Sequence, residues 1–449
     1  MGAVIKNLGW VFKVAAWLAV PMGVFAQTAP VAAPSHDDLE FQAQAAYQAK
    51  HFEAAAALYA RAAALGHYSE TSNDEYDEAC SFARAGDKAK ALQALTQAVN
   101  DGWSKTRTAS DPDLVSLHGD PRFTALLPKL TMTSIPWKAY YRSQTLVRLP
   151  DGRRFNFFCL GKGGPTALLD GSLSQWSFEW KDVQSALART TRVCAIDRAG
   201  YGFSDPGPLP RDAAAETTDL EQALKAAHMS GPYILVGHSF GGTTVRLFAY
   251  RHPDQVAGIL LVDPEIDQSD PRVASFKSAD QKGIIHYRHC LAQAKARKLV
   301  PGYIVPGDED PCLPKRQEGV SKADWAELSK LYFSKAWFEV VLSETENEDS
   351  SAKEIDTSRH SFGSMPLIIL SSDKAHFTED RPRGVDADQL YKAWIAGHED
   401  QAKDSSQGKN IIVDGASHFV FEERPEVFIK AFNDVVAQAR RGGSGSSAQ

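Results

Sequence analysis

The stretch from Tyr233 to Arg251, YILVGHSFGGTTVRLFAYR, limits the possible folds of this chain more than any other. An apolar run leads into GHSFG at residues 237–241, and an amphipathic segment follows directly. This order predicts a strand, a sharp turn and a helix, with Ser239 at the tip of the turn. Glycines two residues to either side permit that strained turn. The hydroxyl is expected at a helix N-terminus, where the Phe240 N–H can stabilise an oxyanion. Ser239 is therefore the candidate nucleophile.

Strand patterns alternate with helical patterns from Thr145 onward. The expected strands are Thr145–Leu149, Phe155–Leu160, Thr166–Leu169, Arg192–Ile196, Tyr233–Val236, Gly258–Val262, Leu367–Leu370 and Asn410–Val413. The expected helices are Trp176–Arg189, Asp212–Ala227, Gly242–Arg251 and Pro425–Ala439. This alternation predicts a mostly parallel sheet covered on both faces. The connection from Pro264 to Met365 is about a hundred residues long. A connection of that length is expected to carry its own structure, as a cap over a pocket.

Three motifs in this region are typical of one family. GHSFGG follows the fifth expected strand, DRAGYGFSD (197–205) follows the fourth, and SHFVFEERPEVF (417–428) follows the eighth. Together they make residues 145–440 resemble an α/β-hydrolase. The resemblance implies an α/β fold with an eight-stranded, mostly parallel sheet and a helical cap insertion at 264–365. It also implies a catalytic triad in the chain order serine, acid, histidine.

The resemblance identifies the base but leaves the acid open. A serine hydroxyl needs a histidine base that is itself held by a carboxylate. His418 follows the last expected strand and is that base. Asp263 lies at the tip of the sixth strand before a proline, and Asp373 follows the seventh, about two residues earlier than is usual in the family. Both strand tips can face the histidine, so both remain candidates for the acid, with Asp380 as a lesser one.

The oxyanion hole is expected to use two backbone N–H groups, the first from Phe240. The second is expected from the loop after the third strand, where the family pattern points to Ser172. This loop lacks the His-Gly dipeptide of many relatives, so Leu173 is an alternative donor. His238 is expected to point away from the pocket and to be structural. Asp197 and Arg198, at the start of the DRAGYGFSD motif, are expected to brace the site.

Composition and motifs exclude several functions. The net charge of -7 argues against a nucleic-acid binder. No motif indicates a metal, nucleotide or flavin site, so no cofactor is expected. The serine nucleophile argues against epoxide hydrolases and haloalkane dehalogenases, which use aspartate in this fold. The expected activity is hydrolysis of a small-molecule carboxylic ester. Amide, thioester and carbon–carbon bond hydrolysis use the same triad and remain alternatives, as does a non-catalytic binding protein on this scaffold.

The first 26 residues are typical of an export signal. Lys6 and Lys13, the only charged residues of this segment, precede an apolar core from Val14 to Val24, and a small-residue cleavage site ends at Ala26. This core is too short for a comfortable membrane span. The mature protein is therefore expected in the periplasm or outside the cell, without a membrane span. Residues 27–36 form an Ala/Pro-rich linker, and the Gly/Ser tail at 441–449 is expected to be disordered.

Residues 37–130 are alanine-rich, with a helical period and a repeat. Small and aromatic residues recur after 36 positions: Ala43, Ala46, Phe52, Ala55, Tyr59 and Ala62 correspond to Ala79, Phe82, Lys88, Ala91, Leu95 and Ala98. The pattern resembles tetratricopeptide repeats, of which two units are visible. Asp111 to Leu130 is expected to close this domain as a helix-turn-helix. Such a domain offers a surface for a protein partner.

The five cysteines cannot all pair with one another. Cys290 and Cys312 lie in one loop-rich insertion, and a bridge between them would contribute roughly 3 kcal/mol. Cys159 and Cys194 lie in apolar strands and are expected to be buried thiols, as is Cys80 in its helix. An aromatic stripe in the cap is expected to serve mainly as packing, with a share lining an apolar pocket: Trp325, Tyr332, Phe333, Trp337 and Phe338.

Overall fold

The structure is a computed structural model of the 449-residue chain. It describes residues 34–65, 69–100, 103, 108–109, 111–130, 137–266, 276–299, 312, 322–332, 334–377 and 386–444. The export signal, Phe333 and Asp380 lie outside these ranges. Among the helices within them, none has the length and apolar character needed to cross a membrane.

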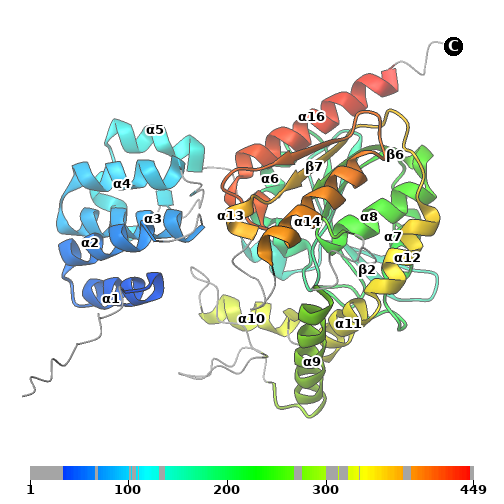
Figure 1. Cartoon of the computed structure of the whole chain (residues 1–449), viewed down its shortest axis with the longest axis horizontal. Coiled ribbons are helices and arrows are strands. Elements are labelled where there is room, and N and C mark those ends of the chain that lie inside the picture. The colour runs from blue at the N-terminus through cyan, green and yellow to red at the C-terminus, as the bar shows by residue number, and fades with distance from the viewer. Residues whose placement is uncertain are drawn as a thin grey trace, which may run out of the picture.

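A mostly parallel sheet forms the centre of the larger lobe (Figure 1). Its strands are β1 (Thr145–Arg148), β2 (Arg154–Leu160), β3 (Thr166–Asp170), β4 (Val193–Asp197), β5 (Tyr233–His238), β6 (Val256–Val262), β7 (Leu367–Ser371) and β8 (Lys409–Ile412). The order across the sheet is β1-β2-β4-β3-β5-β6-β7-β8. β2 is antiparallel to β1 and β4, whereas all the pairs from β4 to β8 are parallel. The predicted eight-stranded sheet is confirmed.

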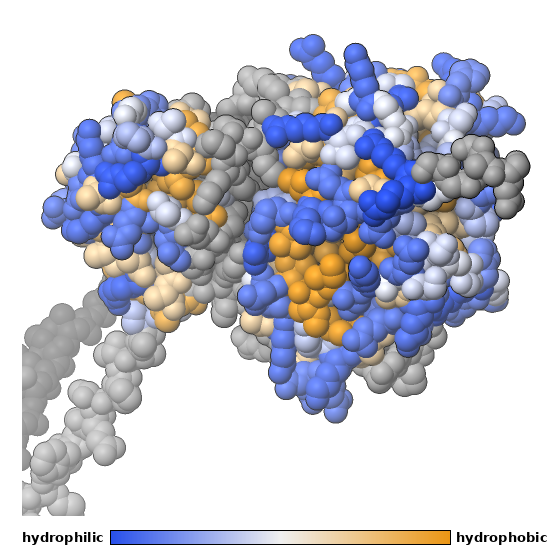
Figure 2. Space-filling view, turned by 90° about the horizontal axis from the view of Figure 1, so that it is seen from above, coloured by the Kyte–Doolittle hydropathy of each residue, from blue (hydrophilic) through white to orange (hydrophobic). Residues whose placement is uncertain are grey.

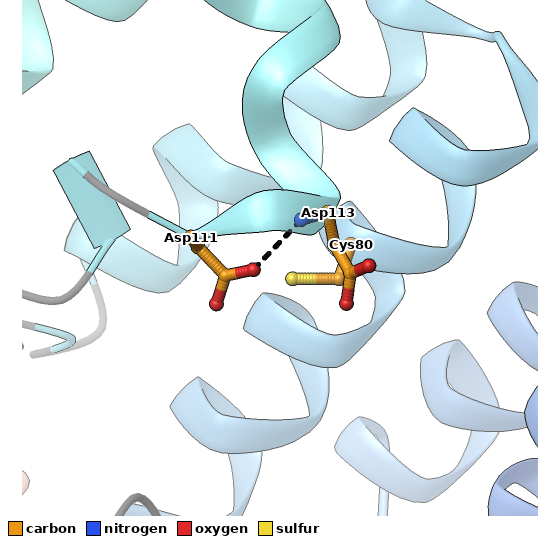
Figure 3. Close-up of side chains that lie close together, drawn as sticks. All are labelled: Cys80, Asp111 and Asp113. Carbon is orange, nitrogen blue, oxygen red and sulfur yellow. Dashed lines mark hydrogen bonds between the residues drawn. The ribbon is translucent and has the colours of Figure 1, made fainter.

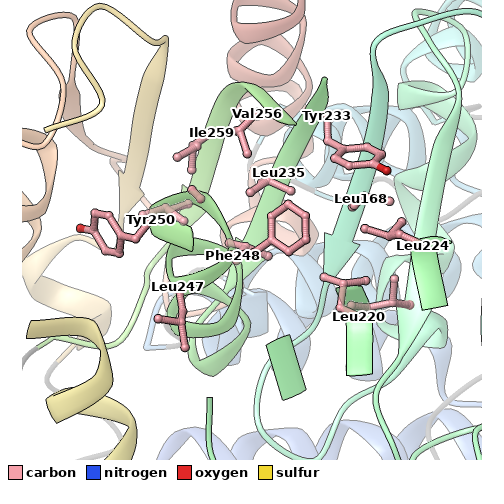
Figure 4. Packing of buried hydrophobic residues seen from close by; sticks show 14 of the residues in the cluster. Leu168, Leu220, Leu224, Tyr233, Leu235, Leu247, Phe248, Tyr250, Val256 and Ile259 are labelled. Carbon is pink, nitrogen blue, oxygen red and sulfur yellow. The ribbon is translucent and has the colours of Figure 1, made fainter. Parts of the chain in front are cut away.

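Helices cover both faces of the sheet, because successive strand residues point to opposite sides. Leu168 and Leu235 pack with α7 (Ala213–Ala226) and α8 (Phe240–Arg251), as Figure 4 shows. Their neighbours, such as Leu169 and Val236, pack on the other face against α6 (Gln184–Leu187) and α16 (Pro425–Ser444). The sequence-based prediction was wrong in two places. Instead of one long helix at 176–189, a 3-10 turn, η4 (Ser177–Asp182), precedes the short α6, and α16 extends into the expected tail.

The insertion between β6 and β7 carries helices, as expected of a cap. They are α9 (Phe276–Lys295), α10 (Lys322–Tyr332), α11 (Lys335–Glu346) and α12 (Glu348–Ser358). Trp325, Tyr332, Trp337 and Phe338 are all buried there, in one cluster with residues of the body such as Trp176. The stripe therefore packs the cap against the body. Beyond β7 follow α13 (Lys374–Phe377), α14 (Ala387–Ala402) and α15 (Val420–Glu423).

Two disulfides are present, of which the sequence predicted one. Cys290 and Cys312 form the expected bridge in the cap. Cys159 and Cys194 also form a disulfide, so the expectation of two separate thiols was wrong. The two residues lie directly opposite each other in the antiparallel pair of β2 and β4. Because directly opposed residues in such a pair have neighbouring Cβ atoms, this register brings the two sulfurs together. Cys80 is buried and unpaired, as expected.

The bridge between β2 and β4 should contribute measurably to stability. It closes a 35-residue loop. We expect the double variant Cys159→Ala/Cys194→Ala to lose about 2–4 kcal/mol of unfolding free energy. Urea unfolding in a Cys290→Ala/Cys312→Ala background, the parent, isolates this effect. Adding dithiothreitol should lower the urea midpoint of the parent to that of the variant. Equal midpoints for parent and variant under oxidising conditions would show that the bridge has no such role.

The smaller lobe consists of paired helices ahead of the sheet (Figure 1). They are α1 (His36–Gln48), α2 (Phe52–Ala63), α3 (Ser69–Ala85) and α4 (Lys88–Asn100), and each packs against the next. α2 begins at 52 and α4 at 88, a shift of 88 − 52 = 36 residues that matches the sequence repeat. The 3-10 helix η2 (Pro112–Leu117) and α5 (Pro121–Leu130) follow.

Figure 2, seen from above, shows mostly polar side chains, with a hydrophobic region near the centre of the larger lobe.

A polar cluster fastens η2 to the paired helices. Cys80, Asp111 and Asp113 lie close together (Figure 3), with potential ligand atoms within 4.8 Å of one another. The hydroxyl of Tyr76 donates to Asp111 at 2.7 Å, and that of Tyr47 donates to Asp113 at 2.5 Å. Burial and the nearby carboxylates raise the pKa of the Cys80 thiol well above its usual value. The cluster is therefore already satisfied by hydrogen bonds, and we assign it a structural role.

Candidate active site

Ser239 lies at a sharp turn between β5 and α8. Its backbone has φ 52° and ψ -121°, which is a strained conformation for a residue with a side chain. The glycines two residues to either side are required, because neighbouring backbone atoms lie where a side chain would begin. A Cβ on Gly237 would lie 2.5 Å from the Gly241 carbonyl oxygen, and one on Gly241 would lie 2.4 Å from that of Asp170. The turn thus places Ser239 at the N-terminus of α8, as predicted.

His418 follows β8 and contacts a carboxylate that lies directly after β6. Its Nδ1 lies 2.8 Å from Oδ2 of Asp263. The other carboxylate oxygen, Oδ1, accepts hydrogen bonds from the Ser372 N–H at 2.9 Å, the Ser372 hydroxyl at 3.0 Å and Trp394 Nε1 at 3.0 Å. Burial alone would raise the pKa of Asp263, but the hydrogen bond and charge of His418 lower it to about 2. Asp263 is therefore an ionised, immobilised partner of His418.

Asp373 contacts the backbone of the loop that carries His418. Its Oδ2 accepts a hydrogen bond from the Gly415 N–H at 2.6 Å, and its own N–H donates to the Ala416 carbonyl at 2.9 Å. These contacts brace the loop that carries His418. The structure therefore pairs Asp263, and not Asp373, with the histidine. The sequence left both aspartates as candidates, because the number of residues after a strand does not show which strand end lies opposite the His418 loop in the folded protein.

The oxyanion loop, residues 171–175, follows β3. The Ser172 N–H donates to Oε2 of Glu179 at 3.0 Å, and the Ser172 hydroxyl donates to Oε1 at 2.8 Å. The expectation that Ser172 supplies the second oxyanion donor was therefore wrong, because its N–H is already engaged. Within the part of the chain that the structure describes, the N–H groups of Leu173 and Phe240 donate to no protein acceptor. Leu173, the alternative from the sequence, is thus the candidate donor beside Phe240.

Glu179 also reaches the histidine loop through His238. Oε1 of Glu179 lies 2.8 Å from His238 Nδ1, and His238 Nε2 lies 2.9 Å from the His418 carbonyl oxygen. A carbonyl only accepts, so Nε2 carries a hydrogen, and a second proton lies between Nδ1 and Glu179. Burial opposes ionisation, but His238 and Ser172 together lower the pKa of Glu179 below its usual value. The His238 side chain thus contacts the loop of His418, where the sequence analysis expected it to point away from the pocket, and it links that loop to the oxyanion loop.

Asp197 and Arg198 brace the site, as predicted. Both are buried. The Asp197 carboxylate accepts hydrogen bonds from the N–H groups of Ser177 and Phe203, each at 2.9 Å. The Arg198 guanidinium donates to the Gly171 carbonyl at 2.7 Å and to that of Ser172 at 2.9 Å. The two motif residues therefore hold the backbone around the oxyanion loop.

Several residues of this site were missed by sequence reasoning. Glu344 on α11 is fully buried against Arg198, and burial raises its pKa to about 7. Its position is detectable in the sequence, because it continues the apolar spacing of Trp337, Val340 and Val341 on one helical face. Glu179, between Phe178 and Trp180, has the same kind of signal. Trp394 and Ser372 offer none, since either would be an ordinary buried residue.

A pocket of about 170 Å³ lies away from this centre. It is bounded by α8, α12 and α14, and its lining includes Thr243, Arg246 and Gln401 but neither Ser239 nor His418. Many of its lining side chains are charged. Its contents would be polar, and its lining residues include the hydroxyls of Thr243 and Ser351 but no histidine that could act as their base. We therefore place the candidate site at Ser239.

The chain belongs to the alpha/beta hydrolase family, whose model matches residues 163–431, more than half of the chain. It is similar to uncharacterized protein C23C11.06c of Schizosaccharomyces pombe, with 44% identity over 82 residues, covering 18% of this chain and 15% of that one. The soluble epoxide hydrolase of Corynebacterium sp. is 31% identical over 114 residues, covering 25% and 39% of the two chains. The chain thus spans less than half the length of either relative. A solved esterase from Thermogutta terrifontis aligns with a TM-score of 0.46 and 18% identity over 66% of this chain and 99% of that one.

Proposed function

We propose that this protein is a serine hydrolase that cleaves a carboxylic ester through an acyl-enzyme. The observation that carries the proposal is the 2.8 Å contact between His418 and the buried Asp263, together with a serine held at φ 52° whose N–H donates to the Val262 carbonyl, next to Asp263, at 3.1 Å. His238, next to Ser239 in sequence, has its ring centroid 4.5 Å from that of His418. Asp263 occupies Nδ1 of His418, which leaves Nε2 as the ring nitrogen for the Ser239 proton.

The reaction follows from these positions. Oγ of Ser239 attacks the ester carbonyl carbon, and its proton passes to Nε2 of His418. The negative charge that develops on the carbonyl oxygen is received by the N–H groups of Phe240 and Leu173. The tetrahedral intermediate collapses, and the leaving alkoxide takes the proton from His418. Water then attacks the acyl-enzyme carbonyl carbon and gives a proton to His418. The second tetrahedral intermediate collapses, Oγ of Ser239 takes that proton back from His418, and the carboxylic acid leaves.

Related acyl substrates are the first alternative. Amidases, thioesterases and carbon–carbon bond hydrolases use the same triad, and nothing in the triad itself selects among them. An ester is proposed before an amide because resonance with nitrogen makes the amide carbonyl carbon less electrophilic. A non-catalytic binding protein on this scaffold is disfavoured by the ionised Asp263, since burying a carboxylate only to orient a histidine is costly.

The proposal also covers the compartment of the protein and the role of the helical lobe. We place the mature protein in the periplasm or outside the cell, and the two disulfides are consistent with an oxidising compartment. The lobe of α1–α5 is proposed to be tetratricopeptide-like. Its two helical pairs, related by 36 residues, would bind a protein partner or contribute to substrate access. Comparing hydrolysis and partner capture with and without residues 36–130 separates these two roles.

The experiment that tests the function combines labelling with a substrate screen. We expect a fluorophosphonate to label the purified wild type covalently at Ser239, as located by peptide mass spectrometry. Chromogenic esters of graded acyl length, with one matched amide, should then show ester turnover well above amide turnover. Amide turnover equal to or above ester turnover would shift the assignment to an amidase. Absence of both labelling and turnover would reject the enzymatic function.

A further inference from the structure

A single buried arginine joins the cap to the oxyanion loop. Arg198 is 2% exposed. Its Nε donates to Oε1 of Glu344 at 3.0 Å, and Nη1 donates to Oδ1 of Asp170 at 2.5 Å and to the Gly171 carbonyl at 2.7 Å. Nη2 donates to the Ser172 carbonyl at 2.9 Å and to Oε2 of Glu344 at 3.5 Å. All five hydrogens of the guanidinium therefore have acceptors, which gives it one orientation.

That orientation determines where the Leu173 N–H points. In a trans peptide the carbonyl and the N–H point in opposite directions. The Ser172 carbonyl points at Arg198, so the N–H of the same peptide, which belongs to Leu173, points away from it. The preceding peptide is held at both ends, by Arg198 at the Gly171 carbonyl and by Glu179 at the Ser172 N–H. Arg198 thus sets the plane of the candidate oxyanion donor.

The partner of Arg198 belongs to the cap. Glu344 lies on α11 and is fully buried. Its Oε2 accepts a hydrogen bond from the hydroxyl of Tyr201, which in turn accepts one from the Ser174 N–H at 3.3 Å. The guanidinium has two carboxylate partners, Asp170 in the body and Glu344 in the cap, so loss of the Glu344 contact leaves it held by Asp170 alone. The position of Arg198 therefore depends on the seating of α11.

Two further bonds from the cap end on the same loop. Nε1 of Trp337 donates to the Ser174 carbonyl at 3.1 Å, and the Tyr332 hydroxyl donates to Oε1 of Gln175 at 3.2 Å. Both come from α10 and α11, the helices that pack the cap onto the body. The oxyanion loop is thus hydrogen-bonded on one side to the cap and on the other to Arg198 and Glu179.

We propose that Glu344 is a positioning residue that orients the Leu173 N–H through Arg198, so that the oxyanion hole is complete only while α11 is seated. This inference rests on the proposed serine hydrolase function. It makes the cap a part of the catalytic machinery as well as a cover.

The test is steady-state kinetics on the best ester from the screen, with kcat expressed per phosphonate-labelled site. For Glu344→Gln we expect kcat to fall on the order of 10- to 100-fold with KM within about threefold, because an oxyanion donor acts mainly in the transition state. Tyr201→Phe keeps the ring and removes the hydroxyl bonded to Glu344, so kcat should fall in the same direction by a smaller factor. This variant decides the test if Glu344→Gln does not fold.

The matched control is Glu346→Gln on the same helix, whose carboxylate pairs with Arg288 at 2.6 Å on the surface of the cap. It should behave as wild type. Wild-type kcat in folded Glu344→Gln and Tyr201→Phe would overturn the inference, as would a rise in KM at constant kcat. Failure of the proposed function itself is distinguishable, because it appears in the wild type as absence of labelling and turnover.

Discussion

Replacing Ser239 by alanine should lower kcat by roughly 10⁴- to 10⁶-fold and abolish covalent labelling, because Oγ of Ser239 is the atom that forms the acyl-enzyme in the proposed mechanism. The residual rate would come from binding and the oxyanion donors alone. The measurement is ester turnover in parallel with phosphonate labelling. Thr218→Ala, on the exposed side of α7, offers a control whose rate should stay unchanged.

The same position should show a conflict between stability and activity. Ser239 has φ 52°, a conformation that costs a residue with a side chain on the order of 1–3 kcal/mol. Glycine adopts it freely but loses more backbone entropy on folding, by about 0.5–1 kcal/mol. We therefore expect Ser239→Gly to be inactive and more stable than Ser239→Ala by about 1 kcal/mol in urea unfolding. A Gly variant less stable than the Ala variant would contradict the strain.

The second large effect concerns the acid. Asp263→Asn should lower kcat by about 10⁴-fold, because an amide no longer stabilises the imidazolium and holds the wrong tautomer of His418. Asp373→Asn should lower kcat by less than about tenfold, since an amide oxygen can still accept the Gly415 N–H at 2.6 Å. The two variants are matched in chemistry and differ only in which loop contact they alter.

The ratio of these two effects is decisive. Comparable, small losses in both variants would remove Asp263 from the triad. A larger loss in Asp373→Asn would show that the loop rearranges on substrate binding so that the second carboxylate reaches His418. Both variants should remain folded, because each amide retains an acceptor, and circular dichroism checks this.

Local patterns were sufficient for much of the fold and part of the site. The eight strands agree with their predicted ranges to within two residues at each end. Apolar runs, glycines and the spacing of helical faces reflect only neighbours along the chain, so they can be recognised without the fold. The same holds for the turn at Ser239. The 36-residue repeat also matched the paired helices.

Contacts between distant segments were decided by the tertiary structure. The register of β2 against β4 joined Cys159 to Cys194. The position of Glu179 engaged the Ser172 N–H, which the sequence analysis had assigned to the oxyanion hole. Each depends on how two separate elements are aligned in space, which a short pattern in either element does not encode.

The turn at Ser239 and the loop of His418 were thus determined by the sequence alone, because each is a local arrangement of strand, glycine and helix. The contact of Asp263 with His418 and that of Glu344 with Arg198 were decided only in the folded chain. Burial is the physical reason. Carboxylates buried in the fold must find a partner, and the partners lie 155 and 146 residues away along the chain.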